Sequence, residues 1–216
     1  MIKGVIFDLD GVIVSTDEFH YQAWQQMADE EGIYFDRHIN ERLRGVSRME
    51  SLEIILERAR KQYSEDQKTE LATRKNNYYK VLLDTRLSPK DILPGVMKVL
   101  TDLKNSNIKI AIGSSSRNSP SILKHIDLEA FFDATADGND IKKSKPDPEV
   151  FLIAAQRLGL EPDECVVVED AEAGITAALN GGMKALAVGS AISDKRAHFA
   201  AKDLAEITID QIINIS

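Results

Sequence analysis

The sequence predicts an α/β protein, with a Rossmann-like core built on a parallel sheet and an α-helical cap domain inserted after the first strand of that core. From Val96 onward, strand-like and helical segments alternate, which is the pattern of a parallel sheet with helices on both faces. From Asp17 to about Ser88, helical patterns follow one another without a convincing strand. We therefore expect residues 1–14 and 92–216 to form the core and residues 15–91 to form the cap.

Composition and charge limit the classes of function. The chain has 216 residues, of which 43% are apolar and 29% charged, as in ordinary globular domains. Its 27 basic and 35 acidic residues give a net charge of −8, which argues against a general nucleic-acid-binding protein. No apolar run is long enough to cross a bilayer, and the first residues lead into an acidic turn rather than a signal peptide. We expect a cytoplasmic monomer without membrane or nucleic-acid partners.

The first predicted strand, Gly4 to Phe7, ends at the acidic turn Asp8-Leu9-Asp10-Gly11. Side chains alternate along an extended backbone, so Asp8 and Asp10 point to the same side. Two carboxylates that close must be compensated by a metal ion, by basic neighbours, or by a proton on one of them. On its own, the pair is equally consistent with a capped turn.

Three helices are predicted in the cap, each preceded by a capping-box sequence. Ser15 to Glu18 precedes a helix in which His20 and Trp24 share one face, as a packed core pair or as functional residues. Ser47 and Glu50 open a helix from Arg48 to Lys61, whose start beside arginine is either an anion site or an ordinary solvent-facing turn. Ser64 to Gln67 opens a helix whose basic residues, Arg74 and Lys75, are typical of a solvated face.

After the Leu93-Pro94-Gly95 break, the core pattern resumes with a helix from Val96 to Leu103 and a strand from Ile108 to Ile112. That strand ends in Gly113-Ser114-Ser115-Ser116-Arg117-Asn118, whose hydroxyl and N–H groups could hold a phosphate. Such a turn is often only a loop. Its position at the carboxyl end of a second parallel strand favours a ligand site, because open α/β sheets bind ligands along that edge.

Two further strand ends carry charged residues. A short strand from Asp133 to Ala136 precedes the proline-restrained loop around Lys145 and a helix from Glu149 to Leu158, so Lys145 is a candidate counter-ion for the acidic clusters. The strand Cys165 to Val168 buries the single thiol and delivers Glu169-Asp170, which form a site or cap the next helix. The last predicted elements are a helix from Ala173 to Leu179, a strand from Ala185 to Val188 and a helix from Ile207 to Ile215.

Six residues in this order, Asp8, Asp10, Ser114, Lys145, Glu169 and Asp170, match the four motifs of the haloacid dehalogenase superfamily, which the whole chain resembles. Within that superfamily the sequence is similar to the β-phosphoglucomutase family. The similar motifs are His20-x-x-x-Trp24, Gly45-Val46-Ser47-Arg48, Arg74-Lys75-Asn76, Ser114-Ser115-Ser116-Arg117-Asn118 and Lys145-Pro146-Asp147-Pro148.

The resemblance implies phosphoryl transfer. Asp8 would be the nucleophile that forms an aspartyl phosphate, and Asp10, with its pKa raised by its neighbours, the general acid and base. Mg²⁺ would be held by Asp8, the backbone carbonyl of Asp10 and Asp170, with Glu169 in or just behind that shell. The phosphoryl group would be held by Lys145, the hydroxyl of Ser114 and the backbone N–H groups of Asp10 and Ser115.

The same resemblance implies a phosphorylated hexose as substrate and a bisphosphate intermediate. Arg48 is the candidate for a distal phosphate site, and His20 and Lys75 would help hold Asp10 and the closed cap. The substrate-binding residues are then expected to be His20, Trp24, Gly45, Val46, Ser47, Arg48, Ser51, Lys75, Ser115, Ser116, Arg117 and Asn118.

Three functions stay open on the sequence: a mutase, a Mg²⁺-dependent sugar-phosphate phosphatase on the same scaffold, and a non-catalytic sugar-phosphate sensor. The sensor is disfavoured because none of the catalytic positions is substituted. One departure from the family pattern is Ser15, where an acidic residue frequently precedes the threonine.

Overall fold

The computed structural model describes residues 1–43 and 46–215. The chain divides into two compact units, a core unit of residues 1–15 and 88–216 and a cap unit of residues 16–87. The boundaries lie at 15/16 and 87/88 rather than the predicted 14/15 and 91/92. The second boundary differs because Ile92 pairs with Val14 and Leu93 donates its N–H to Ile13, which makes this segment part of the core.

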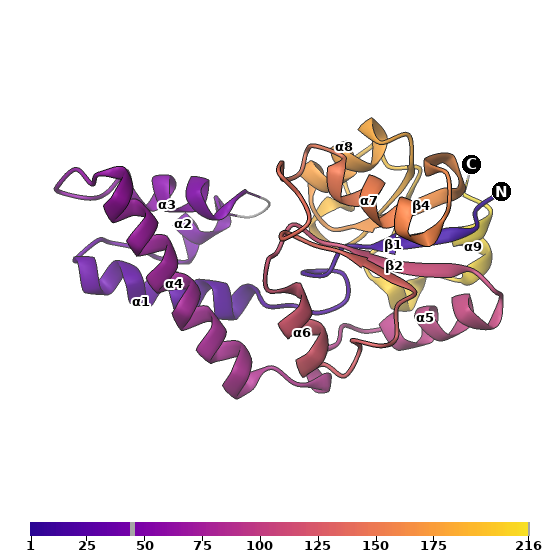
Figure 1. Cartoon of the computed structure of the whole chain (residues 1–216), viewed down its shortest axis with the longest axis horizontal. Coiled ribbons are helices and arrows are strands. Elements are labelled where there is room, and N and C mark those ends of the chain that lie inside the picture. Colours follow the sequence, from indigo (N-terminus) through magenta and orange to yellow (C-terminus); the bar gives the residue numbers. More distant parts are fainter. Residues whose placement is uncertain (44–45, 216) are drawn as a thin grey trace. The chain divides into compact units, whose positions relative to one another are not determined.

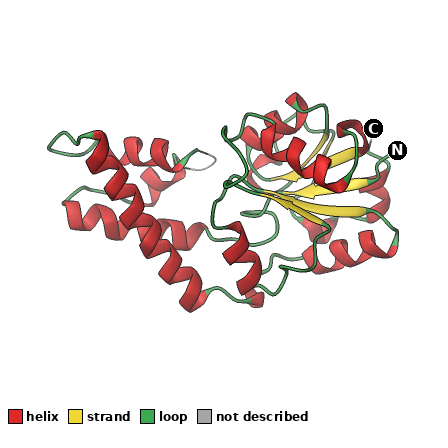
Figure 2. Ribbon diagram, viewed as in Figure 1, coloured by secondary structure: helices red, strands yellow, loops and turns green. Residues whose placement is uncertain are grey.

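The core unit is built on a parallel sheet, which confirms the predicted fold class (Figures 1 and 2). In the part of the chain that is described, the strand order is β3-β2-β1-β4-β5-β6, the order of doubly wound nucleotide-binding folds. The strands are β1 (Gly4–Phe7), β2 (Lys109–Gly113), β3 (Ala134–Ala136), β4 (Cys165–Glu169), β5 (Lys184–Ala187) and β6 (Phe199–Ala200).

Strand register decides which residues meet at the carboxyl edge. Phe7 of β1 lies opposite Ile112 of β2 and Val168 of β4. Asp8 therefore emerges between the ends of two neighbouring strands, at the point where the strand order reverses.

Helices cover both faces of the sheet (Figure 1). α7 (Glu149–Leu158) and α8 (Glu172–Asn180) lie on one face, and α5 (Val96–Asn105) lies on the other, in contact with α9 (Ile209–Ile213). The core unit also contains α6 (Ser119–His125) and the 3₁₀ turns η1 (Pro89–Asp91), η2 (Pro162–Glu164), η3 (Gly189–Ala191) and η4 (Leu204–Glu206).

The cap unit is helical, with α1 (Asp17–Glu31), α2 (Arg37–Glu41), α3 (Arg48–Leu56) and α4 (Glu65–Arg86). Its helices enclose a hydrophobic core of their own, which includes the buried residues Trp24, Met27, Ile39, Leu52, Ile55 and Leu71. A separate apolar core explains why this segment forms a compact unit.

Most predicted elements are confirmed within one or two residues, and β1 and α7 match in both bounds. The capping boxes at Ser47 and Ser64 are present. The box predicted at Ser15–Glu18 is wrong: Thr16 is the N-cap of α1 and makes no side-chain cap bond, and its hydroxyl accepts from Tyr79 instead.

The helix predicted to continue to Lys61 ends at Leu56, and the one predicted from Ile207 to Ile215 is restricted to Ile209–Ile213. The short elements α2, α6 and β6 were not predicted, because each is only a few residues long and carries little periodic signal.

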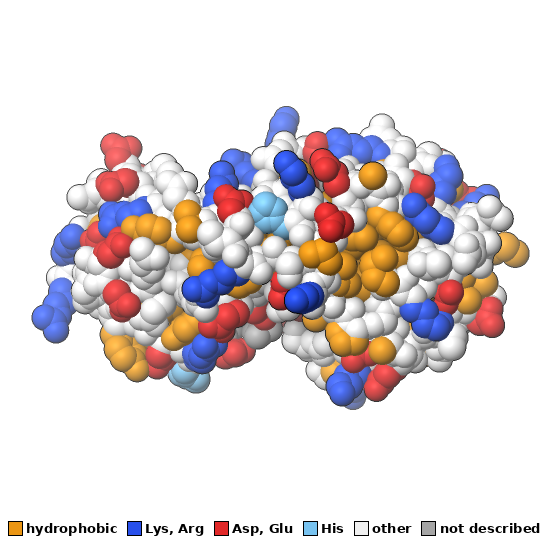
Figure 3. All heavy atoms as spheres, turned by 90° about the horizontal axis from the view of Figure 1, so that it is seen from below, with side chains coloured by type: hydrophobic (Ala, Val, Ile, Leu, Met, Phe, Trp, Pro, Cys, Tyr) orange, Lys and Arg blue, Asp and Glu red, His pale blue; other side chains and the backbone are white. Residues whose placement is uncertain are grey.

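No helix in residues 1–43 and 46–215 is both long and apolar enough to cross a membrane. On the face shown in Figure 3, basic and acidic side chains are interspersed. Cys165 is buried as predicted, and burial raises the pKa of its thiol to about 11.

Candidate active site

Three charged side chains from distant parts of the core unit meet at the carboxyl ends of β1 and β4. The ammonium Nζ of Lys145 donates to Asp8 Oδ1 at 2.5 Å and to Glu169 Oε1 at 2.6 Å. The side chains of Lys145, Asp8 and Glu169 are 9%, 10% and 2% exposed. Water therefore screens these charges weakly, and the lysine is their principal compensation.

The pKa directions follow from this arrangement. Burial alone would lower the pKa of Lys145, but the adjacent carboxylates of Asp8 and Glu169 outweigh it, and the pKa is raised. Burial raises the pKa of Glu169, an effect that Lys145 opposes. The lysine thus stays charged beside the two acidic side chains.

Backbone contacts fix the loop that carries Lys145. The Glu149 carboxylate, in the first turn of α7, accepts from the backbone N–H groups of Lys142 and Lys143 at 2.9 and 2.8 Å. The Asp147 carboxylate accepts from the N–H of Glu149 at 3.1 Å. The lysine is therefore presented from an anchored loop, as its flanking prolines led us to expect.

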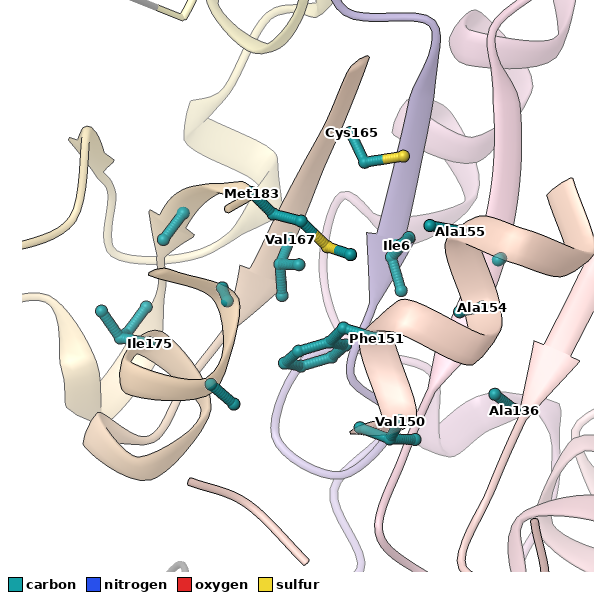
Figure 4. Packing of buried hydrophobic residues seen from close by; sticks show 14 of the residues in the cluster. Ile6, Ala136, Val150, Phe151, Ala154, Ala155, Cys165, Val167, Ile175 and Met183 are labelled. Carbon is teal, nitrogen blue, oxygen red and sulfur yellow. The ribbon is translucent and has the colours of Figure 1, made fainter. Parts of the chain in front are cut away.

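Apolar and glycine residues surround the cluster of Lys145, Asp8 and Glu169. The ring of Phe151 lies 4.6 Å from the Lys145 ammonium and packs against Ile6 of β1 (Figure 4). A Cβ placed on Gly174 would lie 1.9 Å from Glu169 Oε1, so the Glu169 carboxylate rests against the backbone of α8. Glu169 Oε2 also accepts from the N–H of Ala171 at 2.8 Å.

Asp10 and Asp170 also follow the carboxyl ends of β1 and β4. Asp10 forms an isolated bridge with Val14, in a turn closed by the hydrogen bond from the Gly11 N–H to the Val14 carbonyl. Gly11 has φ +84°, and a Cβ there would lie 2.3 Å from Asp170 Oδ2. The Asp170 carboxylate therefore lies directly against the turn that follows Asp8, where only glycine leaves room for it.

The serine-rich turn after β2 is held by its own side chains. Ser114 is 2% exposed, donates its N–H to the carbonyl of Ala136 and accepts at Oγ from the N–H of Ser116 at 3.2 Å. Ser116 Oγ in turn accepts from the N–H of Asn118 at 3.2 Å. These bonds order the turn.

A second loop, which the sequence did not single out, supports this turn. Gly138 donates its N–H to Ser116 and accepts from Arg117 Nε, and Asn139 Nδ2 donates to the carbonyl of Arg117 at 3.1 Å. A Cβ on Gly138 would lie 2.4 Å from the carbonyl oxygen of Ser115. The dipeptide Asp137-Gly138 signals a turn, but nothing in the sequence says which loop that turn would brace.

Within the described ranges, no three His, Cys, Asp or Glu side chains are grouped so that they could hold a metal ion by themselves. The candidate donors at the ends of β1 and β4 are the carboxylates of Asp8 and Asp170 and the backbone carbonyl of Asp10. Such a set suits a hard cation that takes one or two carboxylates and completes its shell with carbonyl, phosphate and water oxygens, as Mg²⁺ does.

In the cap unit, Lys75 contacts two other predicted residues, His20 and Trp24, and one that was not predicted, Tyr79. It is 2% exposed, its Nζ lies 2.7 Å from His20 Nδ1, and it lies over the rings of Trp24 and Tyr79 at 4.8 and 4.9 Å. The predicted solvated face is therefore wrong for Lys75. The buried aromatic Tyr79 stacks on His20 at 4.1 Å, and Trp24 belongs to the cap core.

His20 is held neutral by its surroundings. Burial lowers its pKa well below the usual 6.5, and the charges of Lys75 and Arg48 lower it further. A lysine ammonium can only donate, so Nδ1 is the acceptor and Nε2 carries the proton of the neutral ring. The imidazole thus offers one N–H donor.

The other predicted cap residues lie at the start of α3. Ser47 is its N-cap and forms the box with Glu50, Arg48 is half-buried, and Ser51 is buried at 4% exposure. Val46 is 39% exposed. Gly45 lies outside the described residues.

Open α/β sheets with this strand order bind ligands at the point where the order reverses. Asp8 and Lys145 meet at that point, which is typical of α/β enzymes. The family model of haloacid dehalogenase-like hydrolases matches residues 2–182, and the chain belongs to this family. The resemblance drawn from the motifs is thereby confirmed.

Characterised relatives match over nearly the whole length. The chain is 45% identical over 211 residues to the beta-phosphoglucomutase of Bacillus subtilis, covering 97% of this chain and 93% of the relative. It is 30% identical to a phosphorylated carbohydrates phosphatase of Thermotoga maritima, covering 99% and 98%. The crystal structure of a beta-phosphoglucomutase from Clostridium difficile matches with a TM-score of 0.89 and 41% identity, covering 98% of this chain and 96% of that one.

Proposed function

We propose that this protein is a β-phosphoglucomutase, which interconverts β-D-glucose 1-phosphate and D-glucose 6-phosphate through a glucose 1,6-bisphosphate intermediate. The contact between Asp8 and Lys145 carries the chemistry of this proposal, because it pairs a carboxylate with a fixed cation at the edge where such sheets bind ligands. The choice of a mutase is supported by the 45% identity to the Bacillus subtilis enzyme.

In the proposed reaction, Asp8 Oδ attacks the phosphorus of a sugar phosphate in line with the departing sugar oxygen. The P–O bond to the sugar breaks as the new bond to Asp8 forms, which leaves an aspartyl phosphate. Lys145, the Ser114 hydroxyl and the N–H groups of Asp10 and Ser115 neutralise charge on the equatorial phosphoryl oxygens. The ordered turn after β2 supports this role, because its donors need little reorganisation.

Asp10 is proposed to handle the proton. It protonates the leaving sugar oxygen in one half-reaction and removes the proton from the attacking sugar hydroxyl in the other. His20, whose neutral ring offers an N–H donor, and Lys75 are proposed to hold Asp10 in position when the cap is closed.

Mg²⁺ is proposed to bind Asp8, the carbonyl of Asp10 and Asp170, and when bound it supplies positive charge to the transferring phosphoryl group. Glu169 is proposed to stand just behind that shell. Both of its oxygens accept hydrogen bonds, one from Lys145 and one from Ala171, which supports an indirect role.

A mutase must also bind the phosphate that is not reacting. We assign this to Arg48, whose planar fork suits a phosphate and whose charge already acts on His20. The further substrate contacts are proposed to come from Trp24, Gly45, Val46, Ser47, Ser51, Ser115, Ser116, Arg117 and Asn118. Because Trp24 is buried against Lys75, we propose that it acts through that lysine.

The test is an assay of the full-length protein with Mg²⁺, β-glucose 1-phosphate and a trace of glucose 1,6-bisphosphate. We expect glucose 6-phosphate to form much faster than inorganic phosphate is released, and Asp8→Asn to abolish both. Substantial turnover by Asp8→Asn would refute the nucleophile assignment.

The second candidate is a sugar-phosphate phosphatase, which is favoured by the 30% identity to the Thermotoga maritima phosphatase over the whole chain. Stoichiometric release of phosphate without isomerisation would establish it. The absence of turnover and of any phosphoenzyme would instead favour a sugar-phosphate sensor.

A further inference from the structure

Asp170 is held from two sides by loops that follow different strands. On one side lies the Gly11 turn after β1, where a Cβ would lie 2.3 Å from Asp170 Oδ2. On the other side lies η3, which follows β5 and begins at Gly189, with φ +54°. A Cβ on Gly189 would lie 3.6 Å from the Cβ of Asp170, so this loop also packs closely against the residue.

Ser190 makes the polar contact from the β5 side. Its Oγ lies 2.7 Å from the backbone carbonyl oxygen of Asp170 and 3.4 Å from Asp170 Oδ2. A hydroxyl has one proton, so the short bond to the carbonyl is the principal one and the carboxylate oxygen is its alternative acceptor. Both contacts reach the same residue, one its main chain and the other its side chain.

Backbone hydrogen bonds hold the loop that carries Ser190. Val188 donates its N–H to the carbonyl of Glu169 at 2.8 Å, and Gly189 donates to the carbonyl of Lys202 at 3.0 Å. Ser190 therefore meets Asp170 from a loop that is held at its base. The serine itself is exposed, so its hydroxyl contributes little to the packing of the core.

We propose that Ser190 is a positioning residue for Asp170, which it orients as a Mg²⁺ ligand through these hydrogen bonds. The inference rests on the proposed Mg²⁺ site. Outer partners of this kind fix the rotamer of a ligating carboxylate, and removing one weakens metal affinity by roughly 10- to 100-fold. With the Ser190 hydroxyl removed, Asp170 loses this restraint from the β5 side.

The test measures metal binding by the full-length protein in the absence of any sugar phosphate. Mn²⁺, which is bound by the same oxygen ligands, is titrated while its free form is followed by electron paramagnetic resonance, and Mg²⁺ is then added as competitor. We expect Ser190→Ala to raise the Kd for both ions about tenfold. Ser190→Thr, which keeps the hydroxyl, is expected to restore affinity. Ser106→Ala, at an exposed serine after α5, is the matched control and is expected to leave the Kd unchanged.

Urea unfolding of each variant checks that the fold is intact, and we expect the midpoint of Ser190→Ala to match that of the wild type. A folded Ser190→Ala protein with wild-type Kd values would overturn the inference. A wild-type protein that binds neither ion would overturn it together with the Mg²⁺ site. If the wild type binds Mg²⁺ and Ser190→Ala weakens that binding, but no mutase activity is found, the inference stands and the proposed function fails.

Discussion

Lys145 Nζ lies 2.5 Å from Asp8 Oδ1, although 137 positions separate the two residues in the sequence. The same ammonium lies 2.6 Å from Glu169 Oε1, so one cation pairs with both the proposed nucleophile and Glu169. The contact has a structural and a chemical side. It compensates two buried carboxylates, and it places positive charge where an incoming phosphoryl group would lie.

The first prediction concerns Lys145→Met. Two buried carboxylates would lose their counter-ion, so we expect the free energy of unfolding to fall by about 3–5 kcal/mol. Phosphorylation of Asp8 by a small phosphoryl donor should slow by roughly 10²- to 10³-fold. Urea denaturation and a rapid-quench phosphoenzyme assay measure the two effects.

The double variant Lys145→Met with Glu169→Gln separates stability from chemistry. Removing one negative charge should restore most of the lost stability, because a single carboxylate then remains, but it should not restore phosphorylation. If the double variant were as unstable as Lys145→Met alone, charge compensation of Glu169 would not be the structural role of the lysine.

The second prediction concerns Gly174→Ala in α8. In an open helix this change stabilises by about 0.5–1 kcal/mol. Here the new Cβ would lie 1.9 Å from Glu169 Oε1, so the carboxylate must move away from Lys145. We expect a loss of about 1–3 kcal/mol in unfolding free energy, and a drop in turnover of about 10²-fold from the misplaced cluster.

Gly181→Ala, just after the same helix, is the control. A Cβ there would meet Pro148 Cβ at 3.2 Å, a contact that small shifts relieve. We expect near wild-type turnover for this variant. Equal turnover of both glycine variants would mean that the position of the Glu169 carboxylate does not affect activity.

The core part of this site could be predicted from the sequence because each polar residue follows a strong local signal. Asp8 directly follows an apolar, β-branched strand and Glu169 ends another, and parallel strands bring their carboxyl ends to one edge. The prolines near Lys145 likewise predicted a restrained loop. The distance from Lys145 to Asp8 could not be predicted, because it depends on the tertiary fold.

The supporting residues were not predictable in the same way. Ser190 and Asn139 stand in short loops whose sequences are typical of any turn, and their roles depend on which neighbouring loop they contact. The helical pattern alone placed Lys75 on a solvated face, because charged residues on a helix usually face water, whereas the family resemblance grouped it with His20. The packing of α1 on α4 buries it beside His20.

The third prediction concerns Arg48→Ala. If Arg48 binds the distal phosphate, mutase turnover should fall by roughly 10²-fold, whereas phosphorylation of Asp8 by a small donor without a second phosphate should be nearly unchanged. The ratio of the two rates, measured on the same preparation, is the diagnostic quantity.

Arg42→Ala is the matched control in the cap. Arg42 forms an exposed bidentate pair with Glu57 at 2.8 Å, and losing such a pair costs only about 0–1 kcal/mol of stability. We expect no change in either rate for this variant. An equal loss of both activities in Arg48→Ala would defeat the distal-site assignment.

The fourth prediction concerns the pH dependence of stability in the cap. The folded-state pKa of His20 is lowered well below 6.5, first by burial and then by Lys75 and Arg48. In the unfolded chain His20 binds a proton as the pH falls through 6.5, whereas the folded chain does not, so acidification favours unfolding. Between about pH 7.5 and about pH 5.5, this one proton should remove about 1.4 kcal/mol of unfolding free energy.

The fluorescence of Trp24, the single tryptophan of the chain, reports urea unfolding of the cap in which it is buried. All other titrating groups are shared, so the difference between wild type and His20→Gln isolates His20. We expect the variant to lose less stability on acidification by about that amount, while His38→Gln, at an exposed position in α2, follows the wild type. Parallel pH profiles for wild type and His20→Gln would show that His20 binds its proton equally in both states, contrary to a ring held neutral beside Lys75.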